Sequence, residues 1–443
     1  MRVLLVSHDR VGTSMAGPGI RYWELARELA KRFEVTLAVP AATDLEPEGF
    51  AIVETAPRDS HHLTELGLRA DAVVSQQLPL RTAARLARSS VRTIYDLYAP
   101  VTIEALALFG RGQTVTPRDE LNARHSELAQ QMALLTGDGF ICASEKQRDL
   151  WLGALALAGR LDPQRYRADP AFRSLIDVVP FGIDPRPPRP EPVLRGVVPG
   201  IGTGDRVLLW GGGIWNWFDP LTVIRAVSQL AKRRPELRLY FLGTRHPNPE
   251  IEEMSMTVRA FELAEELGVR NRIVFFNEGW VPYERRGAYL LEADIGVSAH
   301  FDDIETRFAF RTRMLDYLWA GLPIVATQGD ALSEVVRAGK LGRVVDFGDV
   351  QGWMDALDEL LSDETAHASA RTNIEHVRAE YEWPVVTQAL TRMLEFPAAP
   401  FLGTPRIAPL VARDAVVRAR LSLLHRGVRG ALRKQLVRKR PLG

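Results

Sequence analysis

The stretch ETRFAFRTRMLDYLWAGLPIV, residues 305–325, joins a charged opening to a buried helix that ends at a glycine and runs into a strand. Its first nine residues carry one acid and three arginines around two phenylalanines, in a chain whose net charge is only +1. A helix, a glycine and a β-branched strand in this order are typical of one unit of an α/β protein. The positive end of a helix dipole disfavours cations, so the arginines need a further explanation.

The same alternation of strand and helix patterns extends in both directions from this stretch. Buried, β-branched strands that alternate with helices predict parallel sheets with helices on both faces. We therefore expect an α/β protein with two doubly wound, Rossmann-like halves. The predicted strands are 3–7, 35–40, 71–77, 91–98, 139–144, 206–213, 237–243, 272–276, 295–299, 323–327 and 342–347.

A proline-rich segment separates the two halves. Six prolines lie between Pro185 and Pro199, and neither a helix nor a central strand accommodates them. The predicted divisions are a first domain over 1–184, a linker over 185–199, a second domain over 200–382, a helix over 383–396 that can cross back to the first domain, and a Pro-rich and then basic tail over 397–443.

The composition is that of a water-soluble protein, with 46% hydrophobic and 25% charged residues. Cys142 is the only cysteine, which excludes an intramolecular disulfide and argues against a cysteine-based metal site. The first residues have too short an apolar run for a signal peptide, and no stretch approaches the roughly 20 apolar residues that span a bilayer. We expect a cytoplasmic location.

Two glycine-rich loops each follow the first strand of a half. Such loops lie where open α/β sheets bind ligands, and the helix start that follows offers free N–H groups to an anion. A flexible turn is an equal alternative for the first loop, and packing by its own tryptophans is one for the second. Neither matches the dinucleotide fingerprint. The candidate binding glycines are Gly17, Gly19, Gly211, Gly212 and Gly213.

With these features in view, the chain resembles the GT-B glycosyltransferases, in particular the retaining family 4 group (glycosyl transferases group 1). The likeness rests on the two-half layout, PFGID at 180–184, WGGG at 210–213 and AGLPIVAT at 320–327. It implies metal-independent, retaining transfer of a sugar from a nucleotide diphosphate donor, without a cofactor. The expected acceptor is a lipid-linked or cell-surface saccharide, as in polysaccharide biosynthesis.

The resemblance also suggests roles for individual acids. Asp316 would hold the ribose hydroxyls of the donor. The family places a second acid eight residues earlier, but Phe308 stands there, and the nearest acid is Glu305, which would contact the donor sugar. Asp96, at the end of a predicted strand, is a further catalytic candidate that could bond sugar hydroxyls or cap the next helix.

The family is expected to bind the donor diphosphate with an arginine and a lysine at the WGGG loop. In this chain Gly212 and Trp217 stand at about those places. Arginines aimed at a leaving diphosphate stabilise its charge. We predict that Arg311 and Arg313, beside Arg307, replace the missing pair. The alternative is that Arg313 pairs with an acid three residues later and the others are solvated.

The tail over 411–443 has eight Arg and two Lys against one Asp, a local charge of +9, so the rest of the chain carries about −8. Its basic residues interleave with Leu and Val at roughly helical spacing, which favours an anionic membrane surface at the inner face of the membrane. Docking of the tail on the acidic body is the second possibility. Nucleic acid is not an expected partner, because the tail lacks aromatics and a binding module.

Two other functions fit the same residues. One is a sugar-nucleotide epimerase or hydrolase on the same fold. The other is a non-catalytic partner that kept the fold and lost the site, which the missing Arg/Lys pair and the altered acid spacing would explain.

Overall fold

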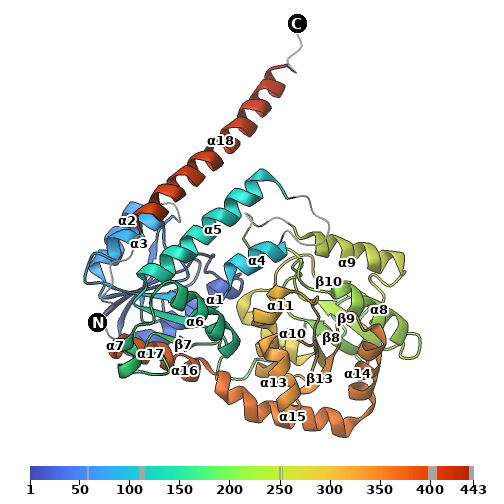
Figure 1. Cartoon of the computed structure of the whole chain (residues 1–443). Coiled ribbons are helices and arrows are strands. Elements are labelled where there is room, and N and C mark those ends of the chain that lie inside the picture. The colour runs from blue at the N-terminus through green and yellow to red at the C-terminus, as the bar shows by residue number, and fades with distance from the viewer. Residues whose placement is uncertain (57–58, 109–114, 249–250, 252, 398–406, 439–443) are drawn as a thin grey trace.

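The computed structural model describes residues 1–56, 59–108, 115–248, 251, 253–397 and 407–438, and its description of side chains ends at residue 424. Among these residues the chain forms two parallel sheets, each covered by helices (Figure 1). The first sheet has seven strands in the order β3-β2-β1-β4-β5-β6-β7. Its strands are β1 Arg2–Val6, β2 Glu34–Val39, β3 Ala51–Glu54, β4 Ala72–Ser75, β5 Arg92–Asp96, β6 Gly139–Cys142 and β7 Ile176–Val178.

The second sheet has six strands in the order β10-β9-β8-β11-β12-β13, again all parallel. In both sheets the strand order reverses direction beside the first strand, between β1 and β4 and between β8 and β11. Ligands bind at such switch points, outside the carboxyl ends of the strands. The strands are β8 Arg206–Trp210, β9 Leu237–Phe241, β10 Val274–Phe276, β11 Ile295–Ser298, β12 Ile324–Thr327 and β13 Gly342–Val345.

The predicted fold class, an α/β protein with two doubly wound halves, is confirmed. All eleven predicted strands are present, and central ones such as β4 and β12 are buried along their whole length, as strands between two helical layers must be. The sequence patterns missed β3 and β7. Both are short edge strands, and β3 has no buried residue, so neither leaves a clear hydrophobic run.

Helices connect the strands and cover both sheets. In the first domain they are α1 Gly17–Ala30, α2 Ser60–Arg69, α3 Leu80–Leu86, α4 Val101–Leu108, α5 Pro117–Thr136, α6 Glu145–Leu157 and α7 Pro163–Ala168. In the second they are α8 Pro220–Leu230, α9 Ser255–Glu266, α10 Arg286–Leu291 after a 3-10 turn at Tyr283–Arg285, α11 Ile304–Phe308, α12 Arg313–Trp319, α13 Ala331–Gly339, α14 Val350–Ser362 and α15 Glu364–Arg378.

The stretch at 305–325 folds as two short helices, α11 and α12, instead of one helix with charged residues in its first turn. Ala309 takes an extended conformation and ends α11. Helix α12 then buries Tyr317, Leu318 and most of its other side chains before Gly321, whose φ of +66° turns the chain toward β12. The break brings Arg311, which lies between the two helices, against Glu305 of α11.

The chain returns to the first domain after α15. A 3-10 turn at Ala379–Tyr381 leads into α16 Trp383–Val386 and α17 Gln388–Glu395, and Arg92 of β5 donates to the Leu394 carbonyl oxygen at 2.6 Å. Helix α18, Ala408–Arg438, then runs alongside α5 and extends beyond the body (Figure 1). No helix in the described part of the chain is long and apolar enough to cross a membrane.

The two domains touch through hydrogen bonds and an ion pair near the carboxyl ends of their strands. The Tyr283 hydroxyl donates to Glu24 at 3.0 Å, and Gln147 Nε2 donates to the Phe308 carbonyl oxygen at 2.9 Å. Lys146 Nζ lies 2.6 Å from a carboxylate oxygen of Glu334. These contacts hold the two switch points opposite one another.

Candidate functional site

A cavity of about 700 Å³ lies between the two domains. Its walls come from the loops after β1, β4 and β8, from α4 and from the α11–α12 region. A cavity of this size is typical of a small-molecule site, and it lies where both switch points place a ligand. Of the predicted site residues, it is lined by Gly17, Gly211, Gly212, Gly213, Glu305, Arg311, Arg313 and Asp316.

The loop after β8 brings its backbone to the cavity. Gly212 has a φ of +77°, a conformation that favours glycine, and nothing lies within 4 Å of where its side chain would begin. The neighbouring Trp215 and Trp217 also line the cavity, and their rings stack on each other with centroids 5.1 Å apart. The loop is therefore packed by its own tryptophans and still leaves its glycine backbone open to a ligand.

Arg311 is engaged within the protein. Its Nη1 and Nη2 atoms donate to the two carboxylate oxygens of Glu305 at 2.9 and 2.5 Å, and both side chains are buried. Arg311 precedes α12, its charge is neutralised by a carboxylate, and its buried Nε has no hydrogen-bond partner among the described residues, so its contact with a diphosphate stays a prediction. The pair fixes Glu305 in the cavity wall.

Arg313 is in a different electrostatic situation. Its Nη2 donates to the carbonyl oxygen of Gly213 at 2.7 Å, and its guanidinium lies over the Phe218 and Trp210 rings, 3.9 and 4.6 Å from their centroids. Its buried Nη1 has no hydrogen-bond partner among the described residues. Burial lowers the pKa of Arg313 to about 9, with Arg311 adding to the effect. An anion at the glycine-rich loop would relieve this unpaired charge.

Asp316 pairs across helices rather than within its own. Arg286 Nε donates to its Oδ1 at 3.1 Å, while the Arg286 guanidinium stacks on Tyr283 and Trp319. The structure therefore does not contain the alternative ion pair between Arg313 and Asp316. Asp316 stays partly exposed on the cavity wall, where its second oxygen can accept from a hydroxyl.

Three predicted site residues lie outside the cavity lining. Asp96 accepts from Arg21 Nε and Nη2 at 2.7 and 2.9 Å, and both side chains are fully buried. Arg307 is exposed on α11. Gly19 packs so closely on the Arg10 carbonyl that a side chain would not fit. The structure explains Asp96 by its buried ion pair with Arg21, and Gly19 by its close packing on the Arg10 carbonyl.

Glu104 is a cavity residue that the sequence patterns missed. It sits on α4 in the apolar segment VTIEALAL and faces the second domain across the cavity. Burial, and next the charge of Glu305, raise the pKa of Glu104 to about 7, against a partial opposing effect of Arg311. A carboxyl that titrates near neutrality in a cavity can act as an acid or base.

The polar groups of the cavity do not form a metal site. Among the described residues, no three His, Cys, Asp or Glu side chains come together in a way that could hold a metal ion. The described lining instead offers glycine backbone, the Arg313 guanidinium with its unpaired Nη1, the arginine-paired carboxylates of Glu305 and Asp316, and the carboxyl of Glu104.

Comparison with known proteins gives matches in sequence and matches in structure. Residues 205–363 match the family of glycosyl transferases group 1. A D-inositol 3-phosphate glycosyltransferase of Corynebacterium urealyticum is 27% identical over 194 residues, 44% of each chain. That of Nocardia farcinica is 29% identical over 196 residues, 44% of this chain and 41% of the relative. The chain thus spans less than half the length of the first curated relatives it matches.

Solved structures match over both domains. Sucrose-phosphate synthase from Thermosynechococcus elongatus has a TM-score of 0.62 at 14% identity, over 89% of this chain and 98% of that one. HepE of Anabaena, in complex with UDP-glucose, has a TM-score of 0.63 at 13% identity, over 89% and 99%. WaaG, a glycosyltransferase involved in lipopolysaccharide biosynthesis, has a TM-score of 0.60 at 16% identity, over 88% and 98%. These matches establish the same two-domain fold.

Proposed function

Because the chain belongs to the glycosyl transferases group 1 family through its second domain and has the GT-B fold, we propose that it transfers a sugar from a nucleotide diphosphate donor to an acceptor bound between its domains. The family and fold expected from the sequence are thereby confirmed. The observation that carries the proposal is Arg313. It is a buried guanidinium with an unpaired Nη1, held against the glycine-rich loop in the interdomain cavity.

In this proposal the donor diphosphate lies against the backbone of Gly211–Gly213, where Arg313 Nη1 can donate to it. Binding there gives Arg313 the counter-charge that the protein does not supply, and the same contact stabilises the charge that develops on the leaving diphosphate. Asp316 accepts hydrogen bonds from the ribose hydroxyls. The presence of UDP-glucose in the HepE structure supports a nucleotide sugar as the donor class.

The donor sugar then faces Glu305, whose position is set by Arg311. A carboxylate that already binds a guanidinium bidentately is a poor nucleophile and a good hydrogen-bond acceptor. This argues against a covalent enzyme intermediate, and the resemblance to the retaining family 4 group supports transfer with retention of configuration. A phosphate oxygen of the leaving group takes the proton of the acceptor hydroxyl on the same face of the sugar.

The acceptor is a lipid-linked or cell-surface saccharide, which α18 helps to bring to the enzyme at an anionic membrane surface. Val416, Leu423 and Leu424 are exposed on this helix at 53, 67 and 41% of their surface. They stand among the basic residues of 411–443, and such an arrangement supports adsorption to anionic lipid. The docking of the first turns of α18 on the body is compatible with this role, since Leu423 and Leu424 stay outside the contact.

Product analysis tests the proposed transfer. The full chain is incubated with a nucleotide diphosphate sugar, with and without saccharide and polyprenyl-phosphate-linked saccharide acceptors. We expect nucleoside diphosphate release that depends on the acceptor, and a glycoside of the same anomeric configuration as the donor. Release of free sugar at the same rate with and without acceptor would support a hydrolase instead, and an inverted product would contradict retention.

A further inference from the structure

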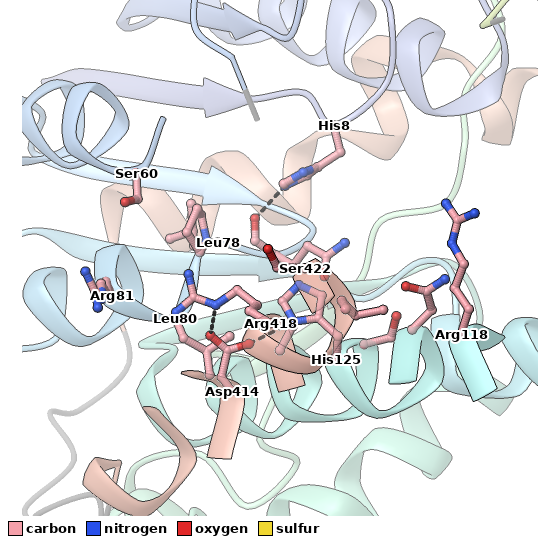
Figure 2. A pocket seen from close by; sticks show the side chains of 16 residues that line it. His8, Ser60, Leu78, Leu80, Arg81, Arg118, His125, Asp414, Arg418 and Ser422 are labelled. Atoms are coloured by element: carbon pink, nitrogen blue, oxygen red, sulfur yellow. Dashed lines mark hydrogen bonds and ion pairs between the residues drawn. The ribbon is translucent and has the colours of Figure 1, made fainter. Parts of the chain in front are cut away.

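Arginines line the cavities of this chain in different ways. A cavity of about 730 Å³ lies on the first domain with α18 as one wall, and its exposed Arg81 and Arg118 stand on opposite sides of it (Figure 2). In the interdomain cavity, by contrast, Arg286 of α10 is held by several groups, and only 13% of its side chain is exposed. A side chain that is fixed in this way can fix a ligand-binding partner in turn.

The guanidinium of Arg286 packs against two aromatic rings. Its Cζ lies 3.8 Å from the ring centroid of Tyr283 and 4.6 Å from that of Trp319. Its Nη1 donates to the Tyr283 carbonyl oxygen at 2.8 Å, and its Nε donates to Asp316 Oδ1 at 3.1 Å. Because the guanidinium is planar and its donors point in fixed directions, ring contacts and hydrogen bonds together set its orientation.

Both rings are anchored outside the second domain. The Tyr283 hydroxyl donates to buried Glu24 of α1 at 3.0 Å. Trp319 Nε1 donates to the carbonyl oxygen of Arg186, in the proline-rich segment that follows the first domain, at 2.7 Å. The place of Arg286 is therefore set by the first domain and by the connecting segment as well as by its own domain.

This arrangement restricts the carboxylate of Asp316, which lines the same cavity and is 33% exposed. A partly exposed aspartate on a helix can otherwise turn between rotamers. The bond from Arg286 engages Oδ1 and leaves Oδ2 able to accept from a ligand hydroxyl. A site built to accept from a particular hydroxyl rejects the analogue that lacks it, because a polar group of the site is then left unpaired.

We propose that Arg286 is a positioning residue for donor recognition, which fixes the Asp316 carboxylate so that the chain selects ribonucleotides over 2′-deoxyribonucleotides. This inference rests on the proposed function, in which Asp316 accepts from the ribose hydroxyls. Arg286 acts through Asp316 and does not itself contact the ribose. The donor is then the sugar derivative of a ribonucleoside diphosphate, and a deoxythymidine diphosphate sugar binds more weakly.

Nucleotide titration of the full chain tests this role. UDP, GDP and ADP are each titrated by calorimetry beside their 2′-deoxy counterparts, and the pair whose ribo form binds the wild type most tightly is kept. We expect the wild type to bind that ribo form about tenfold more tightly than the deoxy form. In Arg286→Met, which keeps apolar contact with the rings, the ratio of the two affinities should fall to about one, because Asp316 is no longer held.

Two further variants calibrate this result. Arg286→Lys keeps a cation that can reach Asp316, so its ratio should lie between those of the wild type and Arg286→Met. It also keeps the test decisive if Arg286→Met does not fold, since its ratio must then still lie below the wild-type one. Arg285→Met is the matched control, because the exposed Arg285 pairs with Glu191 away from the cavity lining, and it should leave the ratio unchanged.

The outcomes separate positioning from other roles. A wild-type ratio near one, or Arg286 variants that weaken both nucleotides equally and keep the wild-type ratio, would overturn the inference. In an Asp316→Asn background, Arg286→Met should no longer change the ratio. A further fall there would mean that Arg286 contacts the ribose directly, which contradicts the positioning role. If UDP, GDP and ADP all fail to bind the wild type, the proposed function itself is contradicted, and this inference falls with it.

Discussion

The Arg311 guanidinium donates to both carboxylate oxygens of Glu305, at 2.9 and 2.5 Å, in a buried pair that joins α11 to the segment before α12. This contact occupies both Nη atoms of Arg311 and holds Glu305 at the cavity wall. Arg313, two residues later, has no carboxylate partner among the described residues and contacts the glycine-rich loop. Arg311 is therefore paired with a carboxylate, whereas Arg313 is the arginine that we propose contacts the donor.

Replacement of Arg313 by methionine separates stability from binding. The methionine removes a buried unpaired charge while keeping apolar contact with Phe218 and Trp210, so we expect a free energy of unfolding equal to or above that of the wild type. Donor affinity should fall at least tenfold, which is about 1.4 kcal/mol. Urea unfolding and calorimetric titration measure the two effects, with Arg225→Met as the exposed control. Donor binding unchanged in Arg313→Met would exclude its role.

Replacement of Glu305 by glutamine should destabilise the fold because it leaves Arg311 buried without a counter-charge. Breaking one partner of a buried pair typically costs about 3–5 kcal/mol. The double variant Glu305→Gln with Arg311→Met should regain a large part of that loss. Urea unfolding of the wild type, Glu305→Gln, Arg311→Met and the double variant gives the coupling free energy of the pair. Strictly additive changes in the free energy of unfolding would mean that the pair contributes nothing.

The pH dependence of donor affinity should reflect the ionisation of the Glu104 carboxyl. Its pKa of about 7 lies above the ordinary value, so the carboxyl is neutral below pH 7 and becomes negatively charged above it. The new charge repels the donor diphosphate, which does not itself titrate near neutrality. We expect donor affinity to fall severalfold between pH 6 and pH 8 in the wild type, measured by calorimetric titration.

In Glu104→Gln the same titration should give a donor affinity that hardly changes with pH. The sign for stability follows from the same shift. Because the pKa of Glu104 is raised in the folded protein, the wild type loses stability relative to Glu104→Gln as the pH rises from the pKa of the unfolded chain to about 7, and the difference stays constant at higher pH. A wild-type profile that Glu104→Gln reproduces would assign the titration to another group.

Replacement of Gly212 by alanine should disturb the loop that receives the diphosphate. The φ of +77° at Gly212 costs an alanine roughly 1 kcal/mol, so the loop either strains or rearranges. We expect a lower melting temperature and weaker donor binding. Gly204→Ala is the control, because Gly204 has open space around it and no left-handed conformation. Equal effects of the two substitutions on donor affinity would contradict a role for the Gly212 backbone.

The sequence was sufficient for the fold because strand burial and strand–helix alternation are local patterns. Each central strand, such as β12, is a continuous apolar run that ends at a loop, and the short edge strands β3 and β7 were missed for lack of such a run. The positions of the glycine-rich loops followed from the same pattern, since a loop after a first strand must lie at the switch point.

The pairing of charges was not predictable in the same way. Glu305 meets Arg311 only because the chain breaks at Ala309 between two short helices. Glu104 reaches the cavity from the other domain, which no spacing in the sequence reveals. The tail was expected first at a membrane, yet its first turns bury Leu410 and Val417 on the body, because apolar residues at helical spacing serve either contact.

Binding of nucleotide sugars to the full wild-type chain tests the central claim most directly. The chain is screened by thermal shift against UDP-, GDP-, ADP- and TDP-sugars, and hits are titrated by calorimetry. We predict that at least one of them raises the melting temperature and binds one molecule per chain, and that the matching nucleoside diphosphate competes while the free nucleoside does not. If none of these donors binds, or if the nucleoside competes as well as its diphosphate, the assignment of the interdomain cavity to a nucleotide diphosphate sugar is wrong.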